Sequence, residues 1–535
     1  MSGGPGVGEE ARVARSAGKV GLATLLSRVL GLVREQVMAT LFGAGLATDA
    51  FNVAFRIPNL LRDLFAEGAM SSAFVPTFTG IHERSGADEA WEFARRLMVT
   101  LLLALLAVCA VGYFATPALV RLFAPGFGAV PGKVDLTVML TRVMLPFLPA
   151  VALAAAAMGM LNARGHFGVP ALAPSLLNVG MIVFGVGLIP VCQAAGQPPI
   201  LAMAIGVVIG GALQFLVQLP PLYRLGFRLR LEWPRLDPGV TRVARLMAPA
   251  TVGLAATQVN LLVSTILASL LPQGSVSWLW YAFRLMQLPI GVFGVALATV
   301  SLPALSRAAV ANDVRALKTT LSATLRLVLL LTVPAAVWLA VMSRPVVALL
   351  YEHGRFGLAD TGRTAGALIM YCVGLPAFAG VGVLTRCFYA LGDTRKPVQA
   401  SFVSVALNLA LNLLLMGPLA HLGLALSTSI TAVANFLQLA FYLRRRVGPL
   451  EGRRMFATLA RVLAASAAAL TPCALGLALL GERWHGGAAM EALTVGAGAV
   501  VALVLGYAAL RLLRVEELGA VEETTRAIRA RLGGR

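Results

Sequence analysis

The fold is decided by a stretch near the N-terminus, residues 27–78, which reads SRVLGLVREQVMATLFGAGLATDAFNVAFRIPNLLRDLFAEGAMSSAFVPTF. Long apolar runs in this stretch predict helices over 20–43 and 48–80, the second broken near Pro58. Its polar residues recur with a period of about 3.6 residues, so they share one face of each predicted helix. These two polar stripes contain Thr24, Ser27, Arg28, Gly31, Arg34 and Glu35, then Asp49, Asn52, Arg56 and Asn59. Charged stripes on apolar helices predict membrane helices that face a polar interior.

The composition of the whole chain agrees with a membrane protein. Hydrophobic residues make up 58% of the 535 residues, and charged residues make up only 13%. Soluble domains have roughly 25% charged residues, and the mean hydropathy here is +0.83. These values exclude a soluble globular domain, a disordered chain and a secreted disulfide scaffold. We therefore predict an all-α polytopic membrane protein.

Apolar runs and turn signals predict about fourteen transmembrane helices, because a spanning helix needs ~20 residues. With the N-terminus inside, the inside segments hold 29 lysines and arginines and the outside loops hold 6. This bias follows the positive-inside rule and predicts that both termini are cytoplasmic. The predicted spans are 20–43, 48–80, 94–116, 136–163, 169–191, 199–223, 243–271, 276–306, 321–342, 361–391, 397–416, 420–443, 456–480 and 488–513.

An internal repeat divides the chain. NVAFRIPNLL around Arg56 returns as WYAFRLMQLP around Arg284, at an offset of 228 residues. Two six-helix lobes followed by two extra helices are the expected result, as in transporters with parallel repeats and a site between the lobes. The predicted parts are an N-terminal tail (1–19), an N-lobe (20–235), a C-lobe (236–445), two helices forming a lipid-tail groove (446–514) and an amphipathic tail (515–535).

Metal, cofactor and catalytic chemistry have no support in the sequence. The five cysteines are scattered in apolar runs without metal-ligand spacing, and no Walker A loop, GxSxG or HExxH motif occurs. The sequence therefore predicts no cofactor, no metal and no catalytic residue. The net charge of +20 follows the membrane topology, so it does not indicate a nucleic-acid partner.

The arginines inside predicted spans need an explanation, because each costs at least ~2.5–3.5 kcal/mol at mid-bilayer. One explanation is mutual neutralisation, with two sets of neighbours: Arg34 with Glu35 or Asp49, and Arg62 with Asp63 or Glu67. Arginine also binds phosphate through two parallel hydrogen bonds. A hydrated anion-binding cavity and purely structural arginines therefore remain as alternatives for three arginines without a nearby acid: Arg28, Arg56 and Arg284.

The stretch over 27–78 closely resembles the start of the MurJ (MviN) family. These proteins are lipid II flippases of the multidrug/oligosaccharidyl-lipid/polysaccharide exporter superfamily. The resemblance returns in GSVSWLWYAFRLMQLPIGVFGVALATVSLPALS over 274–306, and in YEHGRF, GLPAF and FYALGDTRKPV between residues 351 and 398. It covers nearly the whole chain.

The resemblance implies a fourteen-helix transporter with a cationic cavity, and not an enzyme. It implies that lipid II, the undecaprenyl-diphosphate-linked peptidoglycan precursor, moves from the inner to the outer leaflet of the bacterial plasma (inner) membrane. Matching motif positions that the family needs are Arg28, Arg34, Asp49, Arg62, Glu67 and Arg284. Departures are Phe283 and Gln287 where members have acids, Asp63 where some have a basic residue, and Gly382 near a family lysine that Arg386 replaces. The seventh span has no acid, so a sodium site is not carried over.

The hypothesis at this stage assigns two sets of residues. Substrate contacts are expected from Arg28, Arg34, Arg56, Arg284, Ser27 and Asn52. Gating or charge balance is expected from Glu35, Asp49, Arg62, Glu67, Gln287 and Arg386. Expected partners are lipid II, membrane lipids and the cell-wall synthesis or division machinery. The alternatives are a polysaccharide-lipid flippase, a multidrug exporter, a scaffold of cell-wall assembly, and a membrane glycosyltransferase that uses Glu352 and Asp360.

Overall fold

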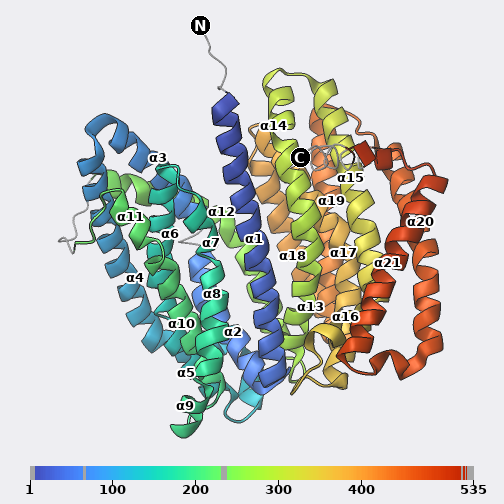
Figure 1. Ribbon diagram of the computed structural model, residues 1–535, viewed down its shortest axis with the longest axis horizontal. Helices are drawn as coiled ribbons and strands as arrows, with labels where there is room; N and C mark the ends of the chain where they lie inside the picture. The colour runs from blue at the N-terminus through green and yellow to red at the C-terminus, as the bar shows by residue number, and fades with distance from the viewer. Residues whose placement is uncertain (1–6, 64–67, 231–237, 520–521, 524–525, 527–535) are drawn as a thin grey trace. The chain divides into compact units, whose positions relative to one another are not determined.

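The structure is a computed structural model that describes residues 7–63, 68–230, 238–519, 522–523 and 526. These ranges contain helices, turns and loops but no strand (Figure 1). The chain divides into two compact units, residues 1–276 and 277–535. Helices of the first unit are α1 (Val7–Phe42), α2 (Leu46–Arg62), α3 (Gly68–Ser85), α4 (Ala87–Phe123), η2 (Pro125–Ala129), α5 (Lys133–Met144), α6 (Phe147–Ala163), α7 (Gly168–Leu172), α8 (Ser175–Val179), η3 (Gly180–Gly185), α9 (Ile189–Ala194), α10 (Ile200–Leu216), α11 (Leu219–Arg224) and α12 (Pro238–Ser269).

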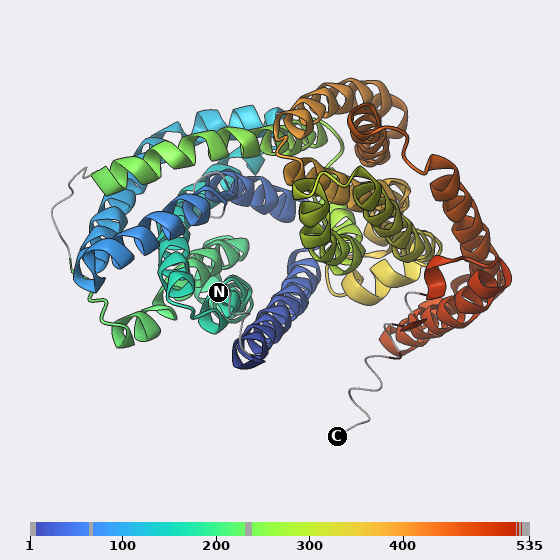
Figure 2. The ribbon, with the colours of Figure 1, turned by 90° about the horizontal axis from the view of Figure 1, so that it is seen from above.

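The second unit begins inside α13 and continues to the C-terminus. Its α18 and α19 pair with each other, and α17 packs against both α19 and α15. Figure 2 shows α20 and α21 as a hairpin at the margin of this unit, where α20 packs on α15. Its helices are α13 (Ser275–Pro289), η4 (Ile290–Gly294), α14 (Val295–Val310), α15 (Val314–Val341), α16 (Ser343–Tyr351), α17 (Leu358–Ala390), α18 (Arg395–Leu419), α19 (His421–Val447), α20 (Gly452–Leu480), η5 (Gly481–His485) and α21 (Ala488–Leu512).

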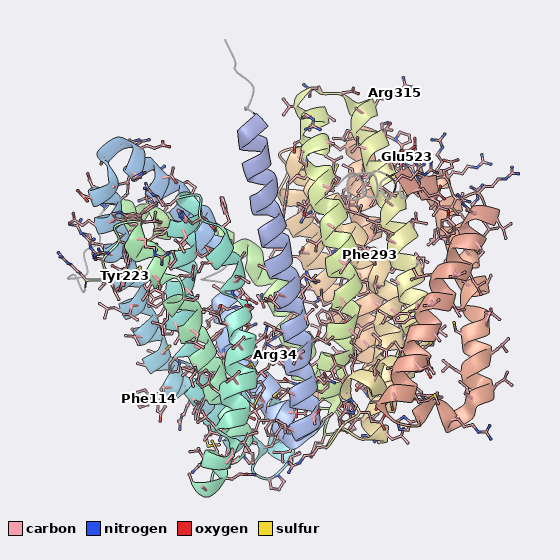
Figure 3. The ribbon with its side chains drawn as sticks, viewed as in Figure 1. Arg34, Phe114, Tyr223, Phe293, Arg315 and Glu523 are labelled. Carbon is pink, nitrogen blue, oxygen red and sulfur yellow. The ribbon has the colours of Figure 1, made fainter. Side chains whose placement is uncertain are left out.

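Within the described ranges, ten helical segments are long and apolar enough to cross a membrane, and two shorter apolar helices cover Ser175–Gly185 and Gln258–Ser269. The all-α membrane fold is therefore confirmed, while the count of fourteen stays a prediction. Strongly apolar spans expose their side chains on the surface, as lipid contact requires. On α4, Phe114 is 80% exposed and points away from the unit (Figure 3).

Several expected spans are interrupted in the structure. The range 48–80, expected to break near Pro58, forms two helices: α2 passes through Pro58 and ends at Arg62, and α3 begins at Gly68. The span expected over 169–191 consists of α7, α8, the π-helical η3 and the start of α9. Pro289 ends α13 and is followed by a second π-helical segment, η4. Proline lacks the amide hydrogen that a regular helix needs. π-Helical segments such as η3 and η4 often mark bends in a helix.

The first unit has two hydrophobic clusters. One lies among α3, α4 and α6, where Phe74, Phe78 and Trp91 are buried and in ring contact. The other lies among α2, α5, α6, α8 and α10. Helix α12 packs on α3 and α4 and belongs to this unit. The lobe boundary predicted between residues 235 and 236 comes from the repeat and stays a prediction; the compact units divide after Val276.

Glycines allow η3 to approach α10 closely. A Cβ atom on Gly180 would lie 2.4 Å from the Cα atom of Gly210, and one on Gly206 would lie 2.9 Å from the carbonyl oxygen of Gly180. The backbones are therefore in direct contact, as in membrane helix pairs that use small residues. The glycine face of the span over 199–223 serves helix packing.

The segment that follows α21 folds back onto its unit. Val515 and Leu518 are buried against α15 and α20. Glu517 lies 2.8 Å from Nε of Arg326, and the hydroxyl of Thr458 donates to Glu517 at 3.3 Å. Farther on, hydrogen bonds from Tyr507 and Arg511 lower the pKa of the Glu522 carboxyl. The first residues of the predicted tail over 515–535 are thus integral to the second unit, and residues 527–535 lie outside the described ranges.

Gly180→Ala tests the close approach. We expect it to destabilise the protein by ~1–3 kcal/mol, because the added methyl group overlaps the α10 backbone. Gly187→Ala is the matched control, since nothing lies within 4 Å of a Cβ atom there. Thermal unfolding of the detergent-purified variants measures both effects. Equal melting temperatures for the two variants would contradict the packing.

Candidate functional site

Arg34 lies in the C-terminal part of α1 (Figure 3), where a carboxylate and an amide hold its guanidinium. It forms an ion pair with Glu35, and its Nη1 donates to Oδ1 of Asn178 in α8 at 3.1 Å. The Nδ2 of Asn178 donates to the backbone carbonyl of Ser27 at 3.2 Å. Both charged residues are buried, at 6% and 5% exposure. Glu35 and Asp49 were the two acids expected to pair with Arg34, and the ion pair observed is with Glu35. The hydrogen bond to Asn178 fixes the guanidinium against α8.

Arg28 lies half-buried on the same helix, six residues before Arg34. In the part of the chain that the structure describes, neither an ion pair nor a hydrogen bond involves its guanidinium. Its helix exposes Leu25, Leu26 and Val29. The charged side chain of Arg28 therefore lies on a helix whose adjacent exposed residues are apolar.

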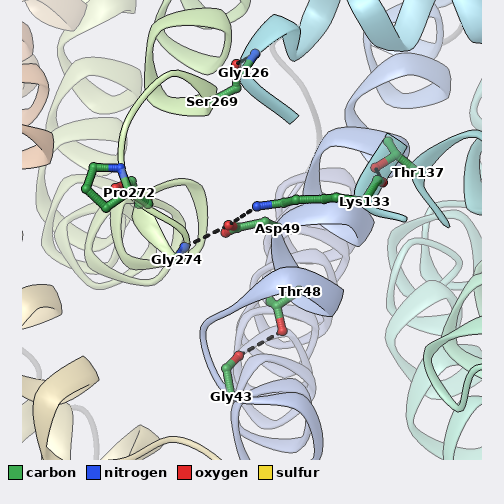
Figure 4. Close-up of polar contacts among 10 residues, drawn as sticks. Gly43, Thr48, Asp49, Gly126, Lys133, Thr137, Ser269, Pro272 and Gly274 are labelled. Carbon is green, nitrogen blue, oxygen red and sulfur yellow. Dashed lines mark hydrogen bonds and ion pairs between the residues drawn. The ribbon is translucent and has the colours of Figure 1, made fainter. Parts of the chain in front are cut away.

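Asp49 is buried at the centre of a three-part contact (Figure 4). Its Oδ2 lies 2.8 Å from Nζ of Lys133 and accepts a 2.8 Å hydrogen bond from the backbone amide of Gly274. The side chains of Asp49 and Lys133 are 2% and 3% exposed, and the ammonium lies 4.1 Å from the centre of the Phe127 ring. This contact links α2, α5 and the connection between α12 and α13. The cation that pairs with Asp49 is therefore Lys133, 84 residues away in sequence, and not an arginine.

The remaining polar residues of α2 face the same way as Asp49. Asn52 is buried, and its Nδ2 has no hydrogen-bond partner among the described residues. Arg56 is half-buried one turn later. The Oδ1 of Asn59 is also buried without a partner in the described ranges. Buried donors and acceptors of this kind cost ~1–3 kcal/mol unless a ligand or water satisfies them.

The end of α2 carries a second local ion pair. Arg62 donates to Oδ1 of Asp63 from Nε at 3.1 Å and from Nη2 at 2.7 Å. The other carboxylate oxygen of Asp63 accepts a 3.1 Å hydrogen bond from Gln258 in α12. Asp63 is therefore the observed partner of Arg62, and Glu67 lies outside the described residues.

Positive charge exceeds negative charge in this part of the first unit. The described polar groups of α1, α2 and α5 discussed above include three carboxylates: Glu35, Asp49 and Asp63. They face five cations: Arg28, Arg34, Arg56, Arg62 and Lys133. Each of these carboxylates forms an ion pair with a different cation, and none of the three pairs involves Arg28. The charge of Arg28, which no described carboxylate balances, suits an anionic ligand.

In the second unit, Arg284 is exposed on α13, and its guanidinium lies 5.2 Å from the Trp280 ring. Gln287 is half-buried one turn later. Phe283 packs edge-on against Tyr371 at 5.5 Å between ring centres. This side chain thus serves aromatic packing between α13 and α17.

Arg386 of α17 has neutral partners only, within the described chain. Its Nη1 donates to the Thr299 hydroxyl at 2.8 Å and to the Val295 carbonyl at 3.3 Å. Both partners lie in α14, directly after the π-helical segment. No group of His, Cys, Asp or Glu side chains in the described ranges is arranged to hold a metal ion.

Comparison with known proteins places these residues in a family. A sequence model described as lipid II flippase MurJ matches residues 38–494. The chain belongs to the lipid II flippase MurJ family. It is 38% identical over 431 residues to a probable lipid II flippase MurJ of Vibrio cholerae, covering 79% of this chain and 81% of the relative. It is likewise 38% identical to the lipid II flippase MurJ of Burkholderia cenocepacia, covering 79% and 82%.

Solved structures agree with this family. A lipid II flippase MurJ in an inward closed conformation superposes with a TM-score of 0.76 at 28% identity, covering 92% of this chain and 99% of that one. A multidrug resistance MATE family transporter in an inward-facing conformation has a TM-score of 0.60 at 15% identity, covering 78% and 98%. The second likeness shows a shared fold.

The Asp49–Lys133 contact generates a stability prediction. Lys133→Met leaves a buried carboxylate without its cation, which costs ~3–5 kcal/mol. We expect a large drop in melting temperature, and a smaller drop for the double variant Asp49→Asn with Lys133→Met. Arg121→Met is the control, because Arg121 is exposed and has no ion pair among the described residues. A Lys133→Met protein that melts like wild type would contradict the contact.

Proposed function

We propose that this chain moves lipid II from the inner to the outer leaflet of the bacterial plasma membrane by alternating access. The named relatives are lipid II flippases, and one solved MurJ structure of the same fold is inward closed. Moving a lipid breaks no covalent bond, so the proposal needs no nucleophile or general base. It needs a polar path for the headgroup and a site for a diphosphate.

The observation that carries the proposal is the charge of Arg28. A mid-membrane arginine costs at least ~2.5–3.5 kcal/mol, and no described carboxylate contacts Arg28. A diphosphate supplies the missing negative charge and accepts paired hydrogen bonds from guanidinium groups. In this proposal Arg28, Arg34, Arg56 and Arg284 bind the diphosphate.

Polar neighbours extend the proposed site. The unpartnered Nδ2 of Asn52 and the hydroxyl of Ser27 suit the sugar and peptide of the headgroup, because both groups can hydrogen-bond to a polar ligand. Charge balance during movement is assigned to Glu35, Asp49, Arg62, Glu67, Gln287 and Arg386. The chemistry of the polyprenyl tail calls for an apolar surface instead.

The α20–α21 hairpin offers such a surface. On α21, Leu493 and Leu503 are 65% and 73% exposed, and α20 exposes Leu475 and Leu479. We propose that the groove over 446–514 binds the lipid tail. The lobes over 20–235 and 236–445 rock during transport, and both termini lie in the cytoplasm. Protein partners are expected in cell-wall synthesis or division.

Two rival functions fit the structure less well. A multidrug exporter shares the fold, but cations rather than acids dominate the described polar helices. A glycosyltransferase would need Glu352 and Asp360 available for catalysis. Asp360 instead accepts hydrogen bonds from Trp278 at 2.8 Å and from the amide of Gly357 at 3.3 Å, and Glu352 accepts one from Thr361 at 2.5 Å. A polysaccharide-lipid flippase remains the second candidate, because it also carries a diphosphate lipid.

Arg28→Ala tests the proposed site. Loss of one charge-assisted contact of ~1.5–3 kcal/mol lowers lipid II affinity about tenfold or more. We expect weaker lipid II binding in native mass spectrometry and no growth of a flippase-depleted bacterium, at normal protein levels. Arg28→Lys should recover part of the binding, because lysine keeps the charge but not the paired hydrogen bonds.

Arg315→Ala is the matched control, since Arg315 is an exposed residue in the first turn of α15. It should bind lipid II and support growth like wild type. Full growth and full binding with Arg28→Ala would contradict the site. Normal binding of a different polyprenyl-diphosphate glycan with no binding of lipid II would favour the polysaccharide-lipid flippase.

A further inference from the structure

The loop between α20 and α21 contacts the corner between α16 and α17 through one imidazole. His485 is the last residue of η5, and its Nε2 lies 3.0 Å from Oε1 of Glu352, which follows α16. Its Nδ1 lies 3.2 Å from Oε1 of Glu491 in the first turn of α21. The imidazole therefore lies between two carboxylates from different helices.

Both carboxylates depend on this imidazole. The Glu491 side chain is 5% exposed, and its Oε2 is buried with no hydrogen-bond partner among the described residues. The Glu352 side chain is 12% exposed, and its other oxygen accepts the hydroxyl of Thr361. A buried carboxylate that lacks a cation carries a large desolvation penalty. The local structure is thus most favourable when His485 is charged.

The number of protons on the His485 imidazole decides how this cluster can pair. A neutral imidazole carries no charge, whereas an imidazolium lies within ion-pair distance of both glutamates, at 3.0 and 3.2 Å, so only the charged form forms an ion pair with each of them. We propose that His485, Glu352 and Glu491 form a proton-binding clasp. The clasp holds the α20–α21 hairpin to the α16–α17 corner when the imidazole is doubly protonated and loosens when it loses a proton. The two ring nitrogens face different carboxylates, so one metal ion cannot replace the proton.

The direction of the pH dependence follows from the charges that face His485. The acids within ion-pair distance of the imidazole are Glu352 after α16 and Glu491 in α21, and η5 itself carries the exposed Arg483. Trp484 packs on the ring at 5.1 Å without adding charge. The cluster has a net charge of about −1 with the imidazolium and −2 without it. Its stabilisation is therefore present while the imidazole is charged and is lost at higher pH, where the imidazole is neutral.

The other end of the hairpin has an anchor of a different kind. There Arg326 of α15 lies 2.8 Å from Glu517 and 3.5 Å from Glu451. Arginine keeps its charge throughout the physiological pH range. The hairpin is thus fixed by a permanent ion pair at one end and by a titratable one at the loop end, and only the loop end responds to protons.

Hydrogen–deuterium exchange of the full chain in lipid nanodiscs tests the clasp, and no lipid II is added. Peptides that cover residues 478–491 and 350–361 are compared at about pH 6 and about pH 8.5, on either side of ordinary histidine titration, after correction for intrinsic exchange rates. We expect exchange about tenfold slower at the lower pH, the effect of one partly buried ion pair on local opening. His485→Gln should exchange fast at both pH values.

The matched control is His353→Gln, because His353 contacts only the Leu349 carbonyl of its own segment. It should keep the pH difference of the wild type. Glu491→Gln provides a second variant, since a neutral amide pairs with a neutral imidazole; it should stay protected at the higher pH. Equal protection of wild type at both pH values, or loss of the difference in His353→Gln but not in His485→Gln, overturns the clasp.

Discussion

A charge inside a bilayer must meet a counter-charge, a polar partner or water, and this constraint organises the first unit. Every described carboxylate on α2 and at its end is in contact with a cation, and so is Glu35 on α1. Buried ion pairs contribute little net stability, since desolvation offsets most of the attraction. Removing one partner of a buried pair lowers stability strongly, because the other charge is left buried alone. Each pair between helices therefore helps to fix which helices pack together.

The sequence predicted the pairs that are local and missed those that are not. Arg34 with Glu35 and Arg62 with Asp63 are adjacent in sequence, so helical spacing was enough to propose them. Asp49 and Lys133 are 84 residues apart in sequence, and topology alone cannot show that the two side chains meet. Helices were predictable from apolar runs. The packing of α12 on α3 and α4, which places it in the first unit, cannot be predicted from hydrophobic periodicity.

The Asp49 contact also determines how the chain leaves the first unit. Its carboxylate accepts the amide of Gly274, two residues before the units divide. Nearby, Gly126 allows the backbone of Ser269 to approach, since a Cβ atom there would lie 2.1 Å from the Ser269 carbonyl oxygen. The connection after α12 is therefore fixed to α2 and η2.

The partners of each arginine decide which of them can bind an anion at low cost. Arg34 already shares its charge with Glu35, so a diphosphate would compete with a carboxylate for the same guanidinium. Arg386 has a hydroxyl and a carbonyl as its described partners, and Arg28 has no described ion pair. An anion that binds Arg28 displaces no described acid. In the proposed site Arg28 therefore contributes more of the attraction for a diphosphate than Arg34, which also holds α1 against α8.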